Sequence, residues 1–288
     1  MNELSLFAPA VPAMIVGHRS DGITPALGLG EPFALLGGDR LGPTGIRFHL
    51  MHEHQPEFWN WVATACDCNL ANEQPWFCGK AILLGGKRGA GRTHAARSLA
   101  HVAGVPHAIL NLTDPLIGSS VAASAMITDQ LWALPTTIAM AAARCANPVV
   151  TVIGIDRVSE NVRAGLVTMI DPATACFWSE DRLGVDIDLS QITWMIQFDD
   201  LKNVPSTLRK MAPVVMLNDP PQGHQSAFVI SIMLEALRDC KIERGHPVYS
   251  VRRIAFALKD GGYNGCLGLY NKVVDAIREL ESEDMYSS

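Results

Sequence analysis

Residues Gly86–Thr93 carry the clearest chemical pattern in the chain. They read GKRGAGRT, which fits the phosphate-binding pattern G-x-x-x-x-G-K-[ST] at every fixed position but one, where Arg92 stands in place of lysine. In such a loop the glycines let backbone N–H groups point at phosphates, the lysine reaches the outer phosphates and the hydroxyl holds Mg²⁺. We therefore predict a nucleotide phosphate site made of the following residues: Gly86, Lys87, Arg88, Gly89, Ala90, Gly91, Arg92 and Thr93.

Arg92 keeps the positive charge of the missing lysine but changes its shape. A guanidinium is longer, planar and forked, whereas an ammonium is a compact point charge. We expect Arg92 to bind phosphate in a displaced position, which favours binding over normal hydrolysis. The alternative interpretation is a glycine-rich turn that leads into a helix of an ordinary α/β domain.

The segments around this loop have the order that the loop requires. Residues 81–84 form a short apolar run typical of a buried parallel strand, and residues 94–104 are rich in Ala and Leu and predict a helix. Further strands are predicted at residues 107–112, 149–155, 191–197 and 214–217, and further helices at residues 56–66, 127–146 and 162–170, with a loop at residues 113–120. Alternating strands and helices predict an α/β fold whose parallel sheet is covered by helices on both faces.

The pattern changes after residue 220. Helical segments are predicted at residues 227–238, 251–258 and 267–280, separated by glycine-rich breaks, and the prolines of NDPPQG at residues 218–223 indicate a hinge. We divide the chain into an irregular N-terminal arm at residues 1–55, an α/β core at residues 56–220 and a small helical lid at residues 221–288. The arm, dense in Gly and Pro, is expected to lie over the core or to reach a neighbouring subunit.

Composition bounds the function classes. The chain has 288 residues, of which 48% are hydrophobic and 18% charged, so it can fill a core. Its net charge of -6 indicates no general affinity for nucleic acid, and no apolar run approaches the length of a membrane span. Seven cysteines at irregular spacing favour a reducing compartment, so we expect a cytoplasmic protein.

A second group of chemically active residue types lies between residues 49 and 78. It comprises His49, His52, His54, Cys66, Cys68 and Cys78. A zinc site drawn from them is one interpretation, but neither HLMHEH nor C-D-C matches an established ligand spacing. We favour a solvated histidine cluster and assign no metal ligands.

Several later segments resemble the ATPase domain of Lon-type AAA+ proteins. NPVVTVIGIDR at residues 147–157 resembles the Walker B region of that family, which runs NP, an apolar strand and then D-E-I-D-K. Asn147, Pro148, Ile155 and Asp156 match this pattern, and Arg157 matches it by charge. The family's D-E pair falls on residues 153 and 154, which are Ile and Gly here.

The resemblance extends over about residues 75–285. LIGSS at residues 116–120, MIDP at 169–172, Phe177 and VDIDLSQITWM at 185–195 each resemble a Lon-type segment. DLKNVPSTLRK at residues 200–210 resembles the stretch that carries sensor 1 and the arginine finger. The sensor 1 asparagine falls on Asp199, and Arg209 matches the first arginine of the family's L-R-x-R pattern.

The departures from the family concern catalysis. In the family the first Walker B acid holds magnesium and the glutamate polarises the attacking water, and Ile153 and Gly154 can do neither. The family's sensor 2 arginine is absent from GCLGLYNK at the start of the last helix, and Arg252 and Arg253 are poor substitutes. A water-positioning residue commonly contributes about 10²–10⁴-fold, so we expect slow or absent hydrolysis.

The polar residues of these segments also have interpretations in which they play no part in nucleotide binding. Asp156 is expected past its strand end, where it is a poor substitute for the lost acids and is suited to capping the next segment. Asp199 and Asp200 then form a solvated turn, and Arg209 pairs with a surface carboxylate.

The resemblance implies three alternative functions. The favoured one is a pseudo-ATPase that binds ATP or ADP, with a degraded Mg²⁺ ligand set, and acts as a scaffold or regulatory subunit. The others are an active divergent AAA+ ATPase that remodels a protein partner, and a structural assembly protein without nucleotide. All three imply other protein subunits in a homo- or hetero-oligomer, in which Arg209 is a candidate arginine finger for a neighbour. Lon proteases carry their protease domain after the lid, and this sequence ends at Ser288, soon after its last predicted helix, so we expect no protease domain.

Overall fold

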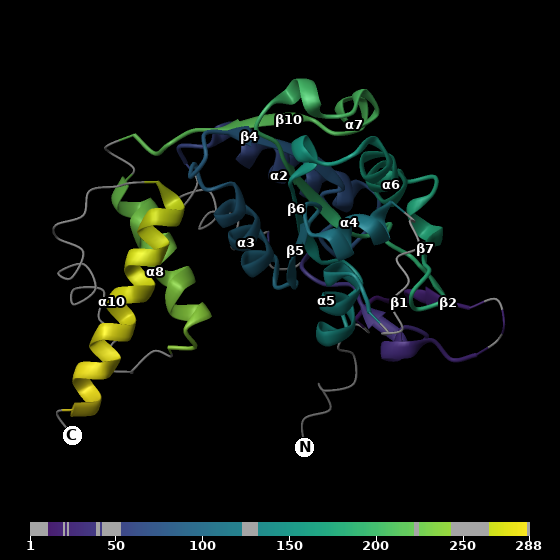
Figure 1. Cartoon of the computed structure of the whole chain (residues 1–288), viewed down its shortest axis with the longest axis horizontal. Helices are drawn as coiled ribbons and strands as arrows, with labels where there is room; N and C mark the ends of the chain where they lie inside the picture. The colour runs from purple at the N-terminus through teal and green to yellow at the C-terminus, as the bar shows by residue number, and fades with distance from the viewer. Residues whose placement is uncertain are drawn as a thin grey trace, which may run out of the picture.

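A computed structural model describes most of the chain (Figure 1). The described residues are 11–19, 21, 23–38, 41, 53–122, 132–221, 225–242 and 265–286. They form an α/β body and, beside it, a pair of long helices near the C-terminus (Figure 1). In the described parts of the chain, no helix combines the length and the apolar composition needed to cross a membrane.

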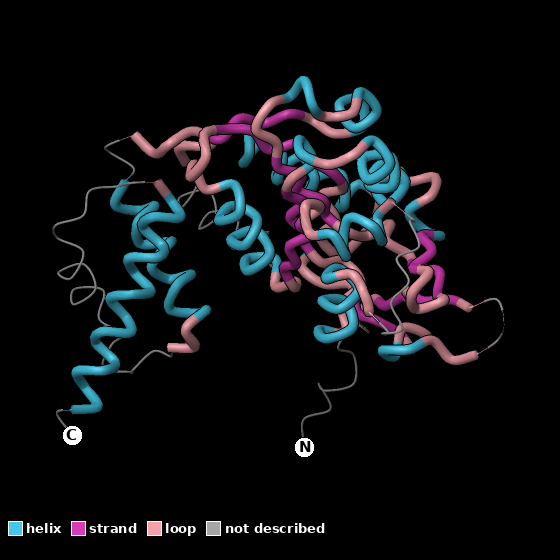
Figure 2. Tube along the Cα trace, in the orientation of Figure 1, coloured by secondary structure: helices cyan, strands magenta, loops and turns pink. Residues whose placement is uncertain are grey.

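A five-stranded parallel sheet forms the centre of the body (Figure 2). Its spatial order is β10 (Val214–Leu217), β4 (Ala81–Gly86), β9 (Thr193–Gln197), β6 (Val149–Ile153) and β5 (His107–Asn111). Neighbouring strands pair in parallel throughout. The predicted parallel sheet is confirmed, and its carboxyl edge gathers the ends of β4, β6 and β9.

Side chains alternate between two apolar layers. In β4, Ile82 and Leu84 join the layer formed with α2 (Pro56–Ala71) and α3 (Arg92–Ala103). Leu83, from the same strand, joins the opposite layer. That layer includes residues of α4 (Pro115–Val121), α5 (Pro135–Ala143) and α6 (Glu160–Ile170). Helices thus cover both faces, as the continuous apolar strands predict.

The described part of the N-terminal segment lies against the body. Strands β1 (Ala13–Ile15) and β3 (Pro32–Ala34) pair with each other, whereas β2 (Gly17–His18) joins β8 (Val185–Ile187), which pairs with β7 (Trp178–Glu180). A short 3-10 turn, η1 (Ala26–Gly28), lies between β2 and β3.

Asn147 ties this segment to the sheet. Its amide donates to the carbonyls of Leu36 and Phe77, each at 2.8 Å, and its oxygen accepts from the N–H of Leu36 at 3.0 Å. Asn147 is fully buried, so these bonds satisfy a polar group that water cannot reach. The asparagine of the NP pattern therefore has a structural task here.

Two sequence predictions are wrong in detail. Residues 113–120, predicted as a loop, contain α4, whose start is capped by Asp114 accepting from the N–H groups of Leu116 and Ile117. The helix predicted at residues 127–146 begins at Pro135 in the described part of the chain, because proline suits the first helical turn. Glu180 holds this start by accepting from the N–H of Leu134 at 2.5 Å.

The C-terminal helices form their own apolar contact. Helix α8 (Gln225–Asp239) packs along α10 (Cys266–Tyr286), as Figure 1 shows at the left. The contact includes Phe228, Ile232, Val273 and Ile277, all of which are buried. The helix predicted at residues 251–258 lies outside the described residues.

Candidate functional site

The glycine loop links β4 to α3 at the carboxyl edge of the sheet. Gly86, Gly89 and Gly91 all have positive φ angles, of 128°, 94° and 88°. A Cβ at Gly86 would lie 2.3 Å from the carbonyl oxygen of Leu217. Both the positive φ angle and this lack of space therefore require glycine at position 86. The structure therefore contains the strand, glycine turn and helix start that the pattern predicts.

The amino ends of two helices meet at this loop. Gly91 is the N-cap of α3, and its carbonyl accepts from the N–H of Ala95 at 2.8 Å. The first residue of α10, Cys266, donates its N–H to the carbonyl of Gly89 at 2.7 Å. The amino end of a helix carries partial positive charge, so the start of α3 favours an anion here, whereas the first N–H of α10 is used by the carbonyl of Gly89. Lys87 and Arg88 are exposed on the loop.

Arg92 is directed to the end of β9. Its Nη1 donates to the carbonyl of Phe198 at 2.5 Å, and its Nη2 lies 2.8 Å from Oδ1 of Asp199. The Arg92 side chain is 11% exposed, whereas that of Asp199 is 62% exposed. The positive charge at the lysine position is therefore paired with a carboxylate of the protein itself.

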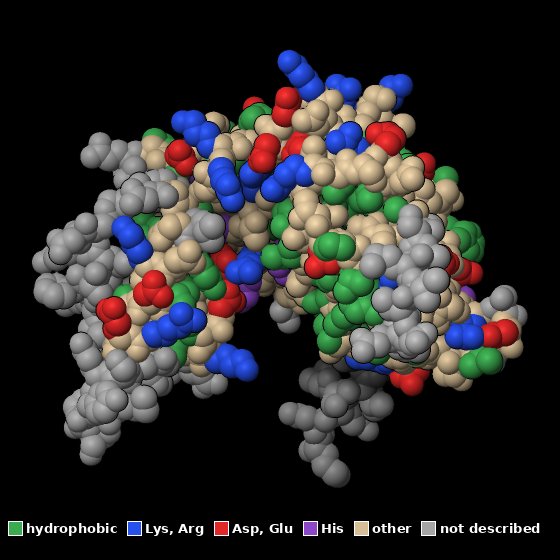
Figure 3. Space-filling view, in the orientation of Figure 1, with side chains coloured by type: hydrophobic (Ala, Val, Ile, Leu, Met, Phe, Trp, Pro, Cys, Tyr) green, Lys and Arg blue, Asp and Glu red, His purple; other side chains and the backbone are tan. Residues whose placement is uncertain are grey.

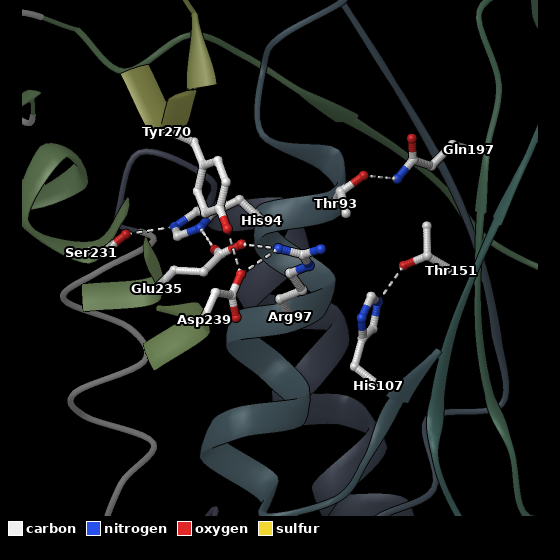
Figure 4. Close-up of polar contacts among 10 residues, drawn as sticks. All are labelled: Thr93, His94, Arg97, His107, Thr151, Gln197, Ser231, Glu235, Asp239 and Tyr270. Carbon is white, nitrogen blue, oxygen red and sulfur yellow. Dashed lines mark hydrogen bonds and ion pairs between the residues drawn. The ribbon is translucent and has the colours of Figure 1, made fainter. Parts of the chain in front are cut away.

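The hydroxyl of Thr93 is also engaged (Figure 4). Gln197, the last residue of β9, donates its amide to Oγ1 of Thr93 at 2.9 Å. Sequence reasoning missed Gln197. The available signal was its position, because it is a polar residue at the end of an apolar strand, where parallel strands place their functional side chains.

Asp156 holds the backbone turn that follows β9. It lies in η2 (Ile155–Arg157), and its two carboxylate oxygens accept from the N–H of Asp199 at 2.8 Å and of Asp200 at 3.4 Å. This turn leads into η4 (Leu201–Asn203). Asp156 thus positions the residue that pairs with Arg92.

The backbone between β6 and η2 leaves little room for a side chain. Gly154 has a φ of 89°, and a Cβ there would lie 2.6 Å from Cγ2 of Thr113. A glutamate at this position would need both an unfavourable backbone conformation and a shift of Thr113. Ile153, which the sequence interpretation places at the other acid position, ends β6.

Arg209 lies apart from these residues in α7 (Ser206–Met211). Its side chain is exposed, and within the described residues no side-chain hydrogen bond or ion pair engages it. The structure does not bring Arg209 to the loop of its own chain. Arg252 and Arg253 lie outside the described residues.

A polar cluster joins α3 to the C-terminal helices (Figure 4). Its members are His94, Arg97, Ser231, Glu235, Asp239 and Tyr270. Glu235 contacts Nδ1 of His94 and Nη1 of Arg97, and Ser231 lies 2.5 Å from Nε2 of His94. Asp239 accepts from Arg97 at 3.0 Å and from the hydroxyl of Tyr270 at 2.6 Å. The residue after Thr93 is therefore fixed to α8.

Charges within this cluster offset the cost of burial. Burial would raise the pKa of Glu235, but its hydrogen bonds and charge interactions with His94 and Arg97 lower that pKa below its ordinary value. Glu235 is 5% exposed and His94 4% exposed, so both belong to the interior. The space-filling view shows histidine, basic and acidic side chains together in the hollow between the body and the helix pair (Figure 3).

The cysteines and histidines at residues 49–78 form no recognisable metal site in the described residues. His49 and His52 lie outside these residues, and no group of three metal-binding side chains occurs within them. Cys66, Cys68 and Cys78 are free thiols. Burial, with a contribution from Asp67, raises the pKa of Cys66 to about 11, which disfavours the metal-binding thiolate.

Comparison with known proteins gives distant similarity to Lon proteases. No family model matches the chain. It is 25% identical over 164 residues, 55% of the chain, to "Lon protease 2" of Bdellovibrio bacteriovorus. It is 28% identical over 173 residues, 57% of the chain, to "Lon protease homolog 2, peroxisomal" of Pichia angusta. The matches span 20% and 18% of the length of these relatives.

Proposed function

We propose that the chain is a Lon-like AAA+ module that binds an adenine nucleotide at Gly86–Thr93 and hydrolyses it slowly or not at all. It then acts as a scaffold or regulatory subunit in a protein assembly. Three findings support a nucleotide site: the parallel sheet, the glycine loop at its carboxyl edge and the distant similarity to Lon proteases. In this proposal, α8 and α10 belong to a helical lid whose first α10 residue contacts the loop.

The proposal that hydrolysis is lost rests on one observation: charged residues near the loop are bound to other groups of the same chain. Arg92 pairs with Asp199, and the carboxylate of Asp156 accepts two backbone N–H groups. Phosphoryl transfer needs metal ligands and a group that positions water. Arg92 and Asp156 are therefore engaged within the protein, which leaves them unavailable for that chemistry.

A magnesium ion does not fit the residues present. Mg²⁺ takes oxygen ligands in octahedral geometry and usually binds through one or two carboxylates and the substrate phosphates. The Thr93 hydroxyl accepts a hydrogen bond from Gln197, Gly154 has no side chain and Asp156 holds the turn after β9. We therefore assign no magnesium ligand and no metal-assisted step.

A second candidate function is a nucleotide-free assembly protein. The observation that favours it is that Arg92 is already satisfied by Phe198 and Asp199. In this case the AAA+ shape serves only for contacts with other subunits. Arg209, exposed on α7, is then available in either function to meet a neighbouring subunit.

The experiment that separates these functions combines two measurements on the full chain. Thermal unfolding is followed with and without ADP or ATP, and phosphate release is measured with ATP and Mg²⁺. A ligand that binds the folded state raises the melting temperature. We expect stabilisation by nucleotide with no phosphate released above background, and reduced stabilisation in Arg92→Ala. Arg278→Ala is the matched control, because Arg278 is an exposed arginine of α10.

The alternative outcomes are distinct. A defined oligomer that no nucleotide stabilises supports the nucleotide-free assembly protein. Rapid phosphate release that depends on Mg²⁺ and disappears in Arg92→Ala supports an active ATPase. The role of Arg209 as an arginine finger is tested with a partner subunit that hydrolyses ATP. If Arg209→Ala leaves the ATPase rate of that partner unchanged, Arg209 is not an arginine finger for it.

A further inference from the structure

We propose that the Gly86–Thr93 loop accepts a metal-free nucleoside diphosphate and disfavours a nucleoside triphosphate with Mg²⁺. This inference rests on the proposed function, because it names the ligand class of the same site. It follows from the distribution of charge at the carboxyl edge of the sheet. The amino end of α3 begins in the loop that would hold the first two phosphates, whereas the carboxylate of Asp199 lies beside Arg92, the side chain expected to reach the third.

The inner phosphates have donors available. In loops of this type the backbone N–H groups cradle the α- and β-phosphates. The amino end of α3 begins in the loop, and the amino end of α10 lies close to it, although the N–H of Cys266 is itself donated to the carbonyl of Gly89. Lys87 and Arg88 add exposed positive charge on the loop itself. A diphosphate, which has no third phosphate, therefore depends less on Arg92 than a triphosphate does.

The third phosphate would meet Asp199. The residue at the position of Arg92 normally reaches the β- and γ-phosphates. Here its guanidinium is at the end of β9, 2.8 Å from Oδ1 of Asp199. A γ-phosphate that approaches Arg92 must share it with this carboxylate, and like charges placed side by side repel. The N–H of Asp199 is held by Asp156 at 2.8 Å, which restrains the backbone from moving the carboxylate aside.

Metal would add little to triphosphate binding. In this loop type the hydroxyl at the position of Thr93 contacts Mg²⁺, which bridges the outer phosphates. An amide N–H of Gln197 is directed at that hydroxyl oxygen at 2.9 Å, so a cation there would face a donor hydrogen (Figure 4). The charge of a third phosphate is therefore not offset by a metal ion.

Calorimetric titration of the full chain tests this inference. ADP and ATP are each titrated in Mg²⁺ and in EDTA, into the wild type, Asp199→Asn and Asp200→Asn. We expect ADP to bind equally with and without Mg²⁺, and ATP to bind at least about tenfold more weakly, as for unfavourable like-charge contacts. Asp199→Asn keeps the side-chain shape and should strengthen ATP binding by about the same factor while leaving ADP unchanged. Asp200→Asn removes the same charge one residue away and should change the ratio less.

Three results overturn the inference, and the third of them also removes the proposed nucleotide site. If ATP with Mg²⁺ binds wild type as tightly as ADP, or if Asp199→Asn leaves the ratio of the two affinities unchanged, the ligand class is wrong and the nucleotide-binding module stands. If neither nucleotide binds the wild type or Asp199→Asn while both unfold cooperatively, the proposed nucleotide site is removed as well.

Discussion

The guanidinium of Arg92 and the carboxylate of Asp199 are partners, although they lie 107 residues apart in the sequence. In our interpretation of the sequence, Arg92 takes the position of the lysine and Asp199 that of the sensor 1 asparagine. Taken separately, Arg92 keeps the positive charge of the lysine, and Asp199 places a negative charge where a neutral amide is expected. Together they form an ion pair that joins the glycine loop to the end of β9.

A double-mutant cycle on Arg92 and Asp199 should give a small coupling energy. The pair is partly exposed, since the Asp199 side chain is 62% accessible. Exposed pairs typically contribute about 0.2–1 kcal/mol, and we expect a value in this range for Arg92→Ala combined with Asp199→Ala. Urea unfolding of the wild type, both single variants and the double variant measures it. Additive effects of the two substitutions would contradict the pairing.

Gly86→Ala should destabilise the protein more than Gly89→Ala. Both glycines have positive φ, which costs about 1–2 kcal/mol for a residue with a side chain. At Gly86 a Cβ would in addition lie 2.3 Å from the carbonyl of Leu217, whereas at Gly89 the nearest neighbour is 3.5 Å away. Thermal and urea unfolding of the two variants provides the comparison. Equal destabilisation would mean that β4 and β10 are not in the register described.

Glu235→Ala should loosen α8 from α3. The substitution leaves His94 without its carboxylate partner and Arg97 with only Asp239 among the acidic partners described. Removing one partner of a buried charged pair costs about 3–5 kcal/mol in general, and we expect about 3 kcal/mol here because Arg97 is one-third exposed. Amide exchange should accelerate in α8 and at the start of α10.

Asp275→Ala is the matched control for this cluster. Asp275 is an exposed acidic residue of α10 whose contact with Arg278 is 3.7 Å long. Its loss should change the free energy of unfolding by less than about 0.5 kcal/mol. If Glu235→Ala has an equally small effect, the cluster does not hold the helix pair.

His107 should make stability fall between pH 6.5 and pH 4. Burial, with a smaller contribution from the charge of Arg97, lowers the pKa of His107 from 6.5 to about 4. The unfolded chain therefore takes up a proton in this window while the folded chain does not, so the free energy of unfolding decreases as the pH falls. In the structure, Nε2 of His107 lies 2.8 Å from Oγ1 of Thr151 (Figure 4).

Urea unfolding of wild type and His107→Gln across this pH range checks the effect. Glutamine cannot titrate and can still bond the hydroxyl of Thr151. The difference in stability between the two proteins should change steadily from pH 6.5 to pH 4 and level off above pH 7. A constant difference would show that His107 is not protected from protonation.

The sheet and the glycine loop were predictable because their patterns are local. Apolar runs such as Val214–Leu217 match their strands, and the loop pattern lies within eight consecutive positions of one strand–helix junction. The short helix α4 was missed because GSS at its end favours turns, and its start depends on the cap from Asp114.

The partners at the site were not predictable from the sequence. The contacts of Arg92 with Asp199 and of Thr93 with Gln197 depend on β9 lying beside β4, and a strand order cannot be deduced from periodicity. Asp156 illustrates the same limit. Capping of the next segment is one interpretation of this residue from the sequence, but the N–H groups that it accepts from lie 43 and 44 residues further along the chain.

The most direct measurement is steady-state phosphate release by the purified full chain with ATP and Mg²⁺, alongside its melting temperature with ADP. We predict that ADP raises the melting temperature while ATP releases no phosphate above background, because Arg92, Thr93 and Asp156 are held by partners within the protein. Rapid phosphate release that is abolished by Arg92→Ala would contradict the central claim.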